Sequence, residues 1–445
     1  MLKVKKEELL IFVSQYVYIC AFYFFNNIGS DNIIFSLIHG TLSSILMCGI
    51  LRSFNKQIDK NLFSLVSMYV FISIVYFHLS SIKYAIDYLY YGYIDNAYIR
   101  MLGSCICFFV MLAEIFLLNH LNKHMRYCSI NNEYKFEISG IFTWVFAIAG
   151  SILMLSISLL GSFSSISESV SNQIFSVVLG ITIVTCLMKI KVNKKGHYYG
   201  FGPLVFVFAI ILVETLALGK RTFIVVPVVI CLASALYLGL IKNHKIIYRL
   251  VIILPIILMA FSTVIFITSS RYNIYSNEFI RDLAYRFDLS DFAMTEAMRT
   301  KWSDYSFASI TEPIQLAIPG IFSKVDKLSI QNVNQYKYIL SKSNLYINAD
   351  YNDTVFSMGS EIAGIVGMIA IPIIIFEFLV FVEKLISVND IFKVTKLAVI
   401  PFFCSVESSW QKIVLDFRMY AVVFIAFYIV LTLFLRKKRW KRKLL

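Results

Sequence analysis

Residues 201–241, FGPLVFVFAIILVETLALGKRTFIVVPVVICLASALYLGLI, consist of two long apolar runs joined by a short Gly-Lys-Arg corner. Each run approaches the roughly 20 apolar residues that an α-helix needs to cross the hydrocarbon core of a bilayer. The apolar residues are continuous and do not alternate with polar ones, a pattern that excludes the strands of a membrane barrel. The stretch therefore predicts two transmembrane helices with a corner at the membrane surface.

Runs of this kind recur along the whole chain of 445 residues. Hydrophobic residues make up 59% of the chain and charged residues 15%, whereas a soluble domain carries about 25% charged residues. We therefore expect one all-α, polytopic membrane domain over residues 1–445, a helical bundle of about 12 transmembrane helices. The expected spans lie near 9–26, 32–51, 62–79, 101–119, 138–160, 173–190, 201–218, 223–241, 249–268, 356–382, 396–410 and 419–435.

The distribution of basic residues orients this bundle. The chain carries 41 Lys and Arg residues and a net charge of +14, and most of these cations fall in alternate connections if both termini are cytoplasmic. This bias is the positive-inside signal of membrane proteins. The basic tail 436–443 is accordingly a topology anchor on anionic membrane lipids and not a nucleic-acid arm. The inner segments are 1–8, 52–61, 120–137, 189–200, 242–249, 383–396 and 436–445.

Residues 269–354 form the one long connection, and the distribution of basic residues places it on the outer side. A loop of this length is usually functional. Apolar residues at helical spacing predict that it is partly helical, with Asp291 close to the start of a second helix. These apolar residues are Phe279, Ile280, Leu283, Ala284, Phe287, Ala293, Met294, Ala297 and Met298. A shorter outer loop over 80–100 is rich in tyrosine.

Several kinds of site are not indicated by the sequence. The chain has no GxxxxGK[ST] motif and no GxGxxG motif in a βαβ context, so a nucleotide site is not expected. Its 6 histidines and 8 cysteines show no metal-ligand spacing, and we expect neither a metal nor another cofactor. A reaction catalysed by this chain would therefore use an activated lipid or a gradient, with its polar groups at the outer face.

The corner at Lys220 and Arg221 faces outward in this topology, against the positive-inside trend. One interpretation is that both side chains extend to lipid phosphates at a helix end. The other is an anion-binding cradle, because an Arg fork suits phosphate and the next helix offers free amides at its N-terminus.

The long outer loop supplies further charged candidates. Arg286, Arg299 and Lys327 could bind an anion, although Asp282 and Arg286 also have the i,i+4 spacing of an ordinary helix-surface pair. A carboxylate beside a cation can act as a general base. The candidates for that role are Asp288, Asp291 and Glu214, the last about one to two turns below the Lys-Arg corner.

Four features together resemble the Wzy-type polymerases of O-antigen, enterobacterial common antigen and capsule repeat units. They are the Gly-x-Arg corner at 219–221, the Arg-aromatic-x-x-x-Asp helix at 286–291, IPGIFSKVDK at 318–327, and SMGSEIAGIVGMIAIP at 357–372. The resemblance covers about 200–375. Ile318, Pro319 and Lys327 match the loop pattern of the family, whereas Phe322 stands where that pattern has Trp and its second Pro is absent.

The resemblance implies a GT-C-like fold and a metal-independent glycosyltransferase in the bacterial inner membrane. Its partners would be undecaprenyl-pyrophosphate-linked oligosaccharides and a chain-length regulator protein. A growing glycan would pass from undecaprenyl pyrophosphate to the non-reducing end sugar of a lipid-linked repeat unit at the periplasmic face. Arg221, Arg286 and Lys220, with Arg299 and Lys327, would bind the pyrophosphate, and a carboxylate would deprotonate the acceptor hydroxyl.

Three alternatives remain open. A flippase for lipid-linked oligosaccharides would handle the same substrate, but it should place ionisable groups along many spans and does not need a long outer loop. An O-antigen ligase would expel the same lipid pyrophosphate and transfer the glycan to lipid A core. Another outer-face enzyme, such as a sugar acyltransferase, is the third.

Overall fold

The structure is a computed structural model, and it describes parts of the chain. The described residues are 6–26, 30–58, 65–91, 97–124, 134–137, 140–163, 168–192, 198–218, 249, 251–253, 294, 354–386, 421, 424–426, 428–429, 432–433 and 436–439.

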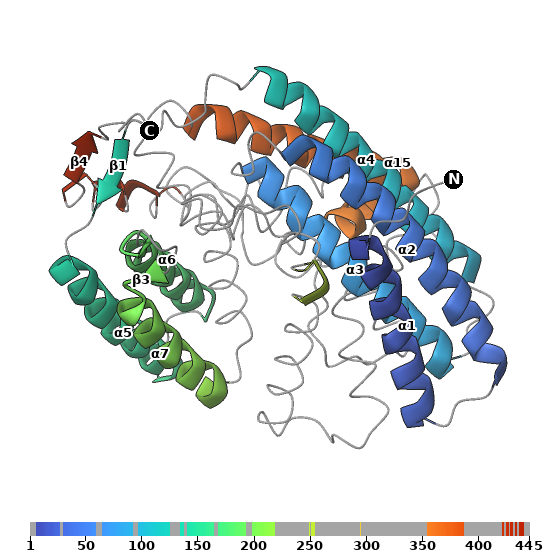
Figure 1. Cartoon of the computed structure of the whole chain (residues 1–445), viewed down its shortest axis with the longest axis horizontal. Helices are drawn as coiled ribbons and strands as arrows, with labels where there is room; N and C mark the ends of the chain where they lie inside the picture. The colour runs from blue at the N-terminus through green and yellow to red at the C-terminus, as the bar shows by residue number, and fades with distance from the viewer. Residues whose placement is uncertain are drawn as a thin grey trace, which may run out of the picture.

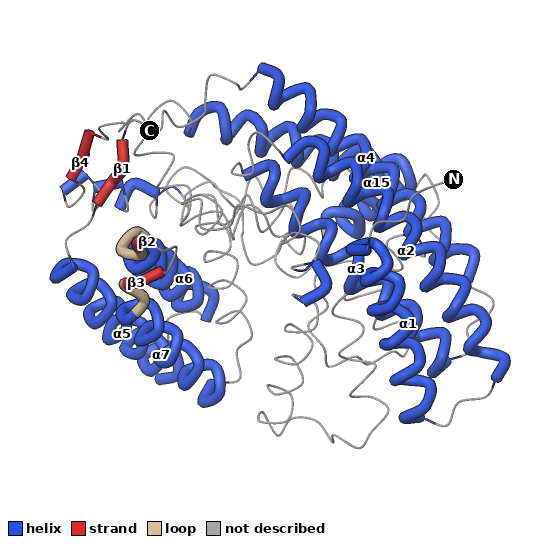
Figure 2. The backbone as a smooth tube through the Cα atoms, in the orientation of Figure 1, coloured by secondary structure: helices blue, strands red, loops and turns tan. Residues whose placement is uncertain are grey.

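Helices account for most of the described backbone (Figures 1 and 2). They are α1 (Lys6–Asn26), α2 (Ser30–Ile58), α3 (Leu65–Tyr91), α4 (Ala97–His124), α5 (Gly140–Phe163), α6 (Glu168–Leu187), α7 (Gly202–Leu218) and α15 (Val355–Ile386). Each of these helices coincides with one expected span. The expected spans 223–241, 249–268, 396–410 and 419–435 lie wholly or largely outside the described residues.

Four of the described helices contain apolar stretches long enough to cross a membrane. The stretches are Ile33–Phe54, Met101–His120, Gly140–Ile157 and Ile362–Leu385, of 22, 20, 18 and 24 residues. Shorter apolar stretches occur in α1, α3, α6 and α7. A hydrocarbon core about 30 Å thick needs roughly 20 such residues in a helix. The expectation of a helical membrane protein is therefore confirmed, whereas the number of about 12 spans stays a prediction.

Helix α3 is the centre of an N-terminal bundle. Helices α1, α2, α4 and α15 all contact it, and Figure 1 shows the five helices gathered together. From Val66 to Ser81, every side chain of α3 except Tyr76 is buried. A helix without an exposed polar face is buried in this way at the centre of a bundle. Its neighbours instead expose large apolar side chains, such as Phe109 and Phe116 of α4, as helices in contact with lipid do.

Helices α5, α6 and α7 form a second group, in which each contacts the other two. Gly150 of α5 lies against Thr182 of α6 so closely that a Cβ on Gly150 would overlap Thr182 Oγ1. That hydroxyl donates to the Val178 carbonyl of its own helix at 2.7 Å, so its hydrogen bond is satisfied inside the interface. Small residues that let two backbones approach are typical of helix packing in membranes.

Two short strand pairs occur where the sequence analysis expected only connections. Strand β1 (Tyr134–Glu137) pairs antiparallel with β4 (Arg436–Arg439), and β2 (Lys191–Val192) pairs with β3 (Tyr198–Tyr199). The basic tail, expected only as a lipid anchor, therefore also forms backbone hydrogen bonds with 134–137. Because paired strands are about 5 Å apart, these two segments must lie on the same side of the membrane. The charge-based topology also places them together.

The expectation of an outer loop over 80–100 was wrong for most of that range. Helix α3 continues to Tyr91 and α4 begins at Ala97. Between Ser80 and Tyr91 the sequence has neither Gly nor Pro, the residues that most often end a helix. Its tyrosines therefore extend the helix beyond the apolar run that defined the expected span.

Candidate functional site

Almost all of the predicted site residues lie outside the part of the chain that the structure describes. These residues are Lys220, Arg221, Arg286, Asp288, Asp291, Arg299 and Lys327. The backbone of Glu214 lies in α7, about one turn before the helix ends at Leu218, but its side chain falls outside the description as well. The roles assigned to these residues stay predictions.

The described residues nearest to them in sequence are helical. Helix α7 ends at Leu218, immediately before the Gly-Lys-Arg corner. Met294, three residues after the predicted base Asp291, is in helical conformation and fully buried in the hydrophobic core cluster. This single position agrees with the predicted helix in the long outer segment. At the other end of that segment, Thr354 leads directly into α15.

Helix α15 is interrupted close to its start. Gly364 has φ 58° and ψ −138°, and Ala363 before it is also non-helical. Positive φ favours glycine because it has no Cβ. The interruption separates a half-helix, residues 355–362, from the longer part of α15. It also brings Gly359 against Gly367, and a Cβ on either glycine would overlap the carbonyl oxygen of the other. The expected span 356–382 was therefore right in position but not continuous.

The half-helix begins in the protein interior with a cap supplied by its own sequence. Thr354 Oγ1 accepts from the Ser357 amide at 3.1 Å, and Ser357 Oγ accepts from the Thr354 amide at 2.7 Å. This reciprocal pair is a capping box with Ser at the third helical position. Every residue from Thr354 to Ser360 is buried, Val355 at 1% and Phe356 at 2% exposure.

Two backbone donors at this buried end have no partner within the described part of the chain. The Met358 amide donates to the Thr354 carbonyl at 3.0 Å, and the Ser357 amide is capped by Thr354. No hydrogen bond is formed by the amides of Val355 and Phe356 with the residues that the structure describes. Buried amides need a partner, and those at a helix N-terminus attract anions. The start of α15 is therefore a candidate site for an anionic ligand.

Polar side chains are also buried between α1 and α3, the central helix that α15 contacts. Gln15 Nε2 lies 3.0 Å from His78 Nδ1 and donates to Ser81 Oγ at 3.1 Å. Gln15 Oε1 and His78 Nε2 have no hydrogen-bond partner among the described residues. Buried polar groups at membrane depth usually serve a function.

An ion pair joins α1 to α2 near the cytoplasmic ends predicted for both helices. Arg52 donates to the two carboxylate oxygens of Glu8 at 2.5 and 2.6 Å, and Glu8 is only 1% exposed. A bidentate Arg–carboxylate pair is a strong, geometrically specific contact. Both residues were expected in inner connections, and their pairing could not be predicted from the sequence because they are 44 positions apart.

The described part of the chain holds no group of three or more His, Cys, Asp or Glu side chains that could bind a metal ion. No protein-family model, curated protein or solved structure matches the chain.

Proposed function

We propose that this chain is a lipid-linked glycan polymerase of the bacterial inner membrane, with a GT-C-like bundle of about 12 spans and cytoplasmic termini. It transfers a growing glycan from undecaprenyl pyrophosphate to the non-reducing end sugar of a lipid-linked repeat unit. The observation that carries the proposal is the buried N-terminus of the α15 half-helix, where the Val355 and Phe356 amides form no hydrogen bond with the described residues. It follows the outer segment that bears the predicted cations, and it belongs to the glycine-rich stretch on which the resemblance rests.

The proposed reaction needs an anion site at this position. The acceptor hydroxyl attacks the anomeric carbon of the donor sugar, and the bond from that carbon to the pyrophosphate oxygen breaks. Negative charge therefore grows on the leaving pyrophosphate. Arg221 and Arg286, with the α15 amides, stabilise that charge, and each such donor contributes about 3–4 kcal/mol to transition-state stabilisation. The hydroxyl proton passes to one of the carboxylates Asp288, Asp291 or Glu214.

Reconstitution tests the proposal. The purified chain is placed in liposomes with a lipid-linked repeat unit, and the products are separated by glycan length. We expect a ladder of longer lipid-linked glycans without added nucleotide or divalent metal, in the presence of a chelator. The proposal is contradicted if the substrate stays one repeat unit long with every lipid-linked repeat unit that is tested.

A flippase is the second candidate, and the buried polar groups of the N-terminal bundle favour it. Besides the contact of Gln15 with His78, Glu114 of α4 is 1% exposed, and its Oε2 has no partner among the described residues. Transporters place ionisable groups inside their bundles in this way. In the same liposomes a flippase would leave the glycan length unchanged and move the substrate across the bilayer.

A further inference from the structure

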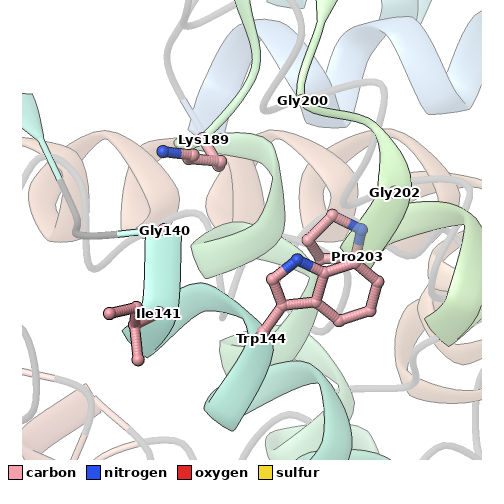
Figure 3. A pocket seen from close by; sticks show the side chains of 7 residues that line it. All are labelled: Gly140, Ile141, Trp144, Lys189, Gly200, Gly202 and Pro203. Carbon is pink, nitrogen blue, oxygen red and sulfur yellow. The ribbon is translucent and has the colours of Figure 1, made fainter.

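A pocket opens at the end of the α5–α7 group that carries strands β2 and β3. Its volume is about 400 Å³, and its lining includes Ile141, Trp144, Lys189 and Pro203 together with three glycines. Figure 3 shows the Lys189 side chain at one end of the pocket and the Trp144 ring beside Pro203 at the other. The pocket therefore has one cationic end and one apolar end.

The cationic end lacks an anion among the described residues. Lys189 follows α6, and its Nζ lies 3.0 Å from the position that a Cβ would take on Gly140, the first residue of α5. The start of a helix carries partial positive charge, so the ammonium group and α5 repel each other. No described carboxylate forms an ion pair with Lys189. A bound anion that contacts both groups would offset this repulsion.

Strand β1, which precedes α5 in the sequence, belongs to a strand pair that is also rich in basic residues. Strand β1 ends at Glu137, close in sequence to Gly140 where α5 begins. In its pairing with β4, Lys135 is directly opposite Lys438, and Arg436 is the one cation of β4 that faces a carboxylate residue, Glu137. Like charges directly opposite each other destabilise a strand pair. The register therefore adds positive charge on the side of the membrane to which the charge-based topology assigns the pocket.

The apolar end matches a lipid rather than a free ion. Ile141 is 77% exposed and Trp144 is 44% exposed, on a helix whose apolar stretch is long enough to span the membrane. The Trp144 ring is held by Phe206 of α7, with ring centroids 6.2 Å apart. Trp residues with an adjacent Lys are typical of the membrane–water interface. An acyl chain could follow Ile141 and Trp144 away from a headgroup at Lys189.

We propose that this pocket binds an anionic phospholipid of the cytoplasmic leaflet. The phosphate contacts the ammonium group of Lys189 and the start of α5, and the acyl chain covers Ile141 and Trp144. Gly200 keeps the connection to α7 close to Lys189, since at φ 92° a Cβ there would fall 2.9 Å from the Lys189 carbonyl oxygen. The site is separate from the proposed glycan chemistry. Of the sequence-based expectations, it depends only on the charge-based orientation.

Lipid retention by the purified full-length protein tests this site. The protein is exchanged into a neutral detergent with equal amounts of phosphatidylglycerol and phosphatidylcholine, and bound lipids are counted by native mass spectrometry. Wild type should retain phosphatidylglycerol preferentially. Lys189→Gln should weaken that retention about five- to tenfold, the effect of one cation at a lipid surface. Lys189→Arg should restore it. Lys384→Gln, which removes an exposed cation from the last turn of α15, should leave it unchanged.

Three results would overturn the proposal. The first is equal retention of the two lipids by wild type, and the second is unchanged retention by Lys189→Gln. The third is release of the bound phosphatidylglycerol by millimolar inorganic phosphate with phosphate retained in its place, which would make the pocket a site for a free ion. Because glycan elongation is not measured, none of these results depends on the proposed polymerase activity.

Discussion

Gly359→Ala and Gly367→Ala should each greatly reduce the amount of folded protein in the membrane. In either variant the new methyl group overlaps a backbone carbonyl on the facing segment of α15, and backbone cannot move aside as a flexible side chain can. Overpacking of this kind costs about 1–3 kcal/mol and sometimes more, a large part of the stability of a protein. The yield of monodisperse protein on size-exclusion chromatography and the midpoint of thermal denaturation measure the loss.

Gly49→Ala provides the matched control for these variants. It makes the same chemical change in α2, but there the nearest atom to the new methyl group is a ring carbon of Phe108 at 3.4 Å. That distance is an ordinary van der Waals contact, and alanine has the better helix propensity, by about 1 kcal/mol. The yield and the denaturation midpoint of Gly49→Ala should therefore equal or exceed those of wild type. If the three variants behave alike, the half-helix of α15 does not fold back as described.

Arg221→Ala and Arg286→Ala should each lower the rate of glycan elongation about 100- to 1000-fold in the liposome assay, because each removes a donor to the leaving pyrophosphate. Protein levels in the membrane should stay at the wild-type value. Lys at either position should restore part of the rate, since it keeps the charge but not the two-pronged geometry of Arg. The measurement is the initial rate at which the second repeat unit is added.

Arg436→Ala controls for the loss of a cation elsewhere. It removes one charge from strand β4, which lies on the opposite side of the membrane from the outer segment in the proposed topology. The elongation rate should stay within about twofold of wild type, the scatter typical of a substitution away from the reacting groups. If Arg221→Ala and Arg286→Ala both elongate glycans normally, the assignment of the pyrophosphate site is wrong, even if the chain is a polymerase.

Hydropathy predicted the helical parts of the fold well. The continuous apolar runs located α1 to α7 and α15 because the hydrocarbon core demands a minimum length of apolar helix. Hydropathy could not predict how far a helix continues beyond the membrane. Helix α3 extends to Tyr91 since nothing in the sequence before Gly92 ends it, although the apolar run stops earlier.

Contacts between distant segments could not be predicted in the same way. The pairing of Lys135 with Lys438 and the ion pair of Glu8 with Arg52 depend on how the helices assemble, which a local pattern does not encode. At the candidate site, the glycine-rich stretch was recognised as a motif, but the interruption at Gly364 depends on backbone conformation. Thr354 and Ser357 did carry a readable signal, the spacing of a capping box.

Photo-crosslinking at the start of α15 tests the central claim, that this buried helix end holds the pyrophosphate of the lipid-linked glycan. p-Azidophenylalanine replaces Phe356, or, as a control on the same helix, the exposed Phe381, and the protein is irradiated with a labelled, short-chain polyprenyl-pyrophosphate glycan. We expect labelling at position 356 that excess inorganic pyrophosphate suppresses, with labelling at 381 weaker and unaffected. Labelling at 356 that is absent, or that pyrophosphate does not change, would contradict it.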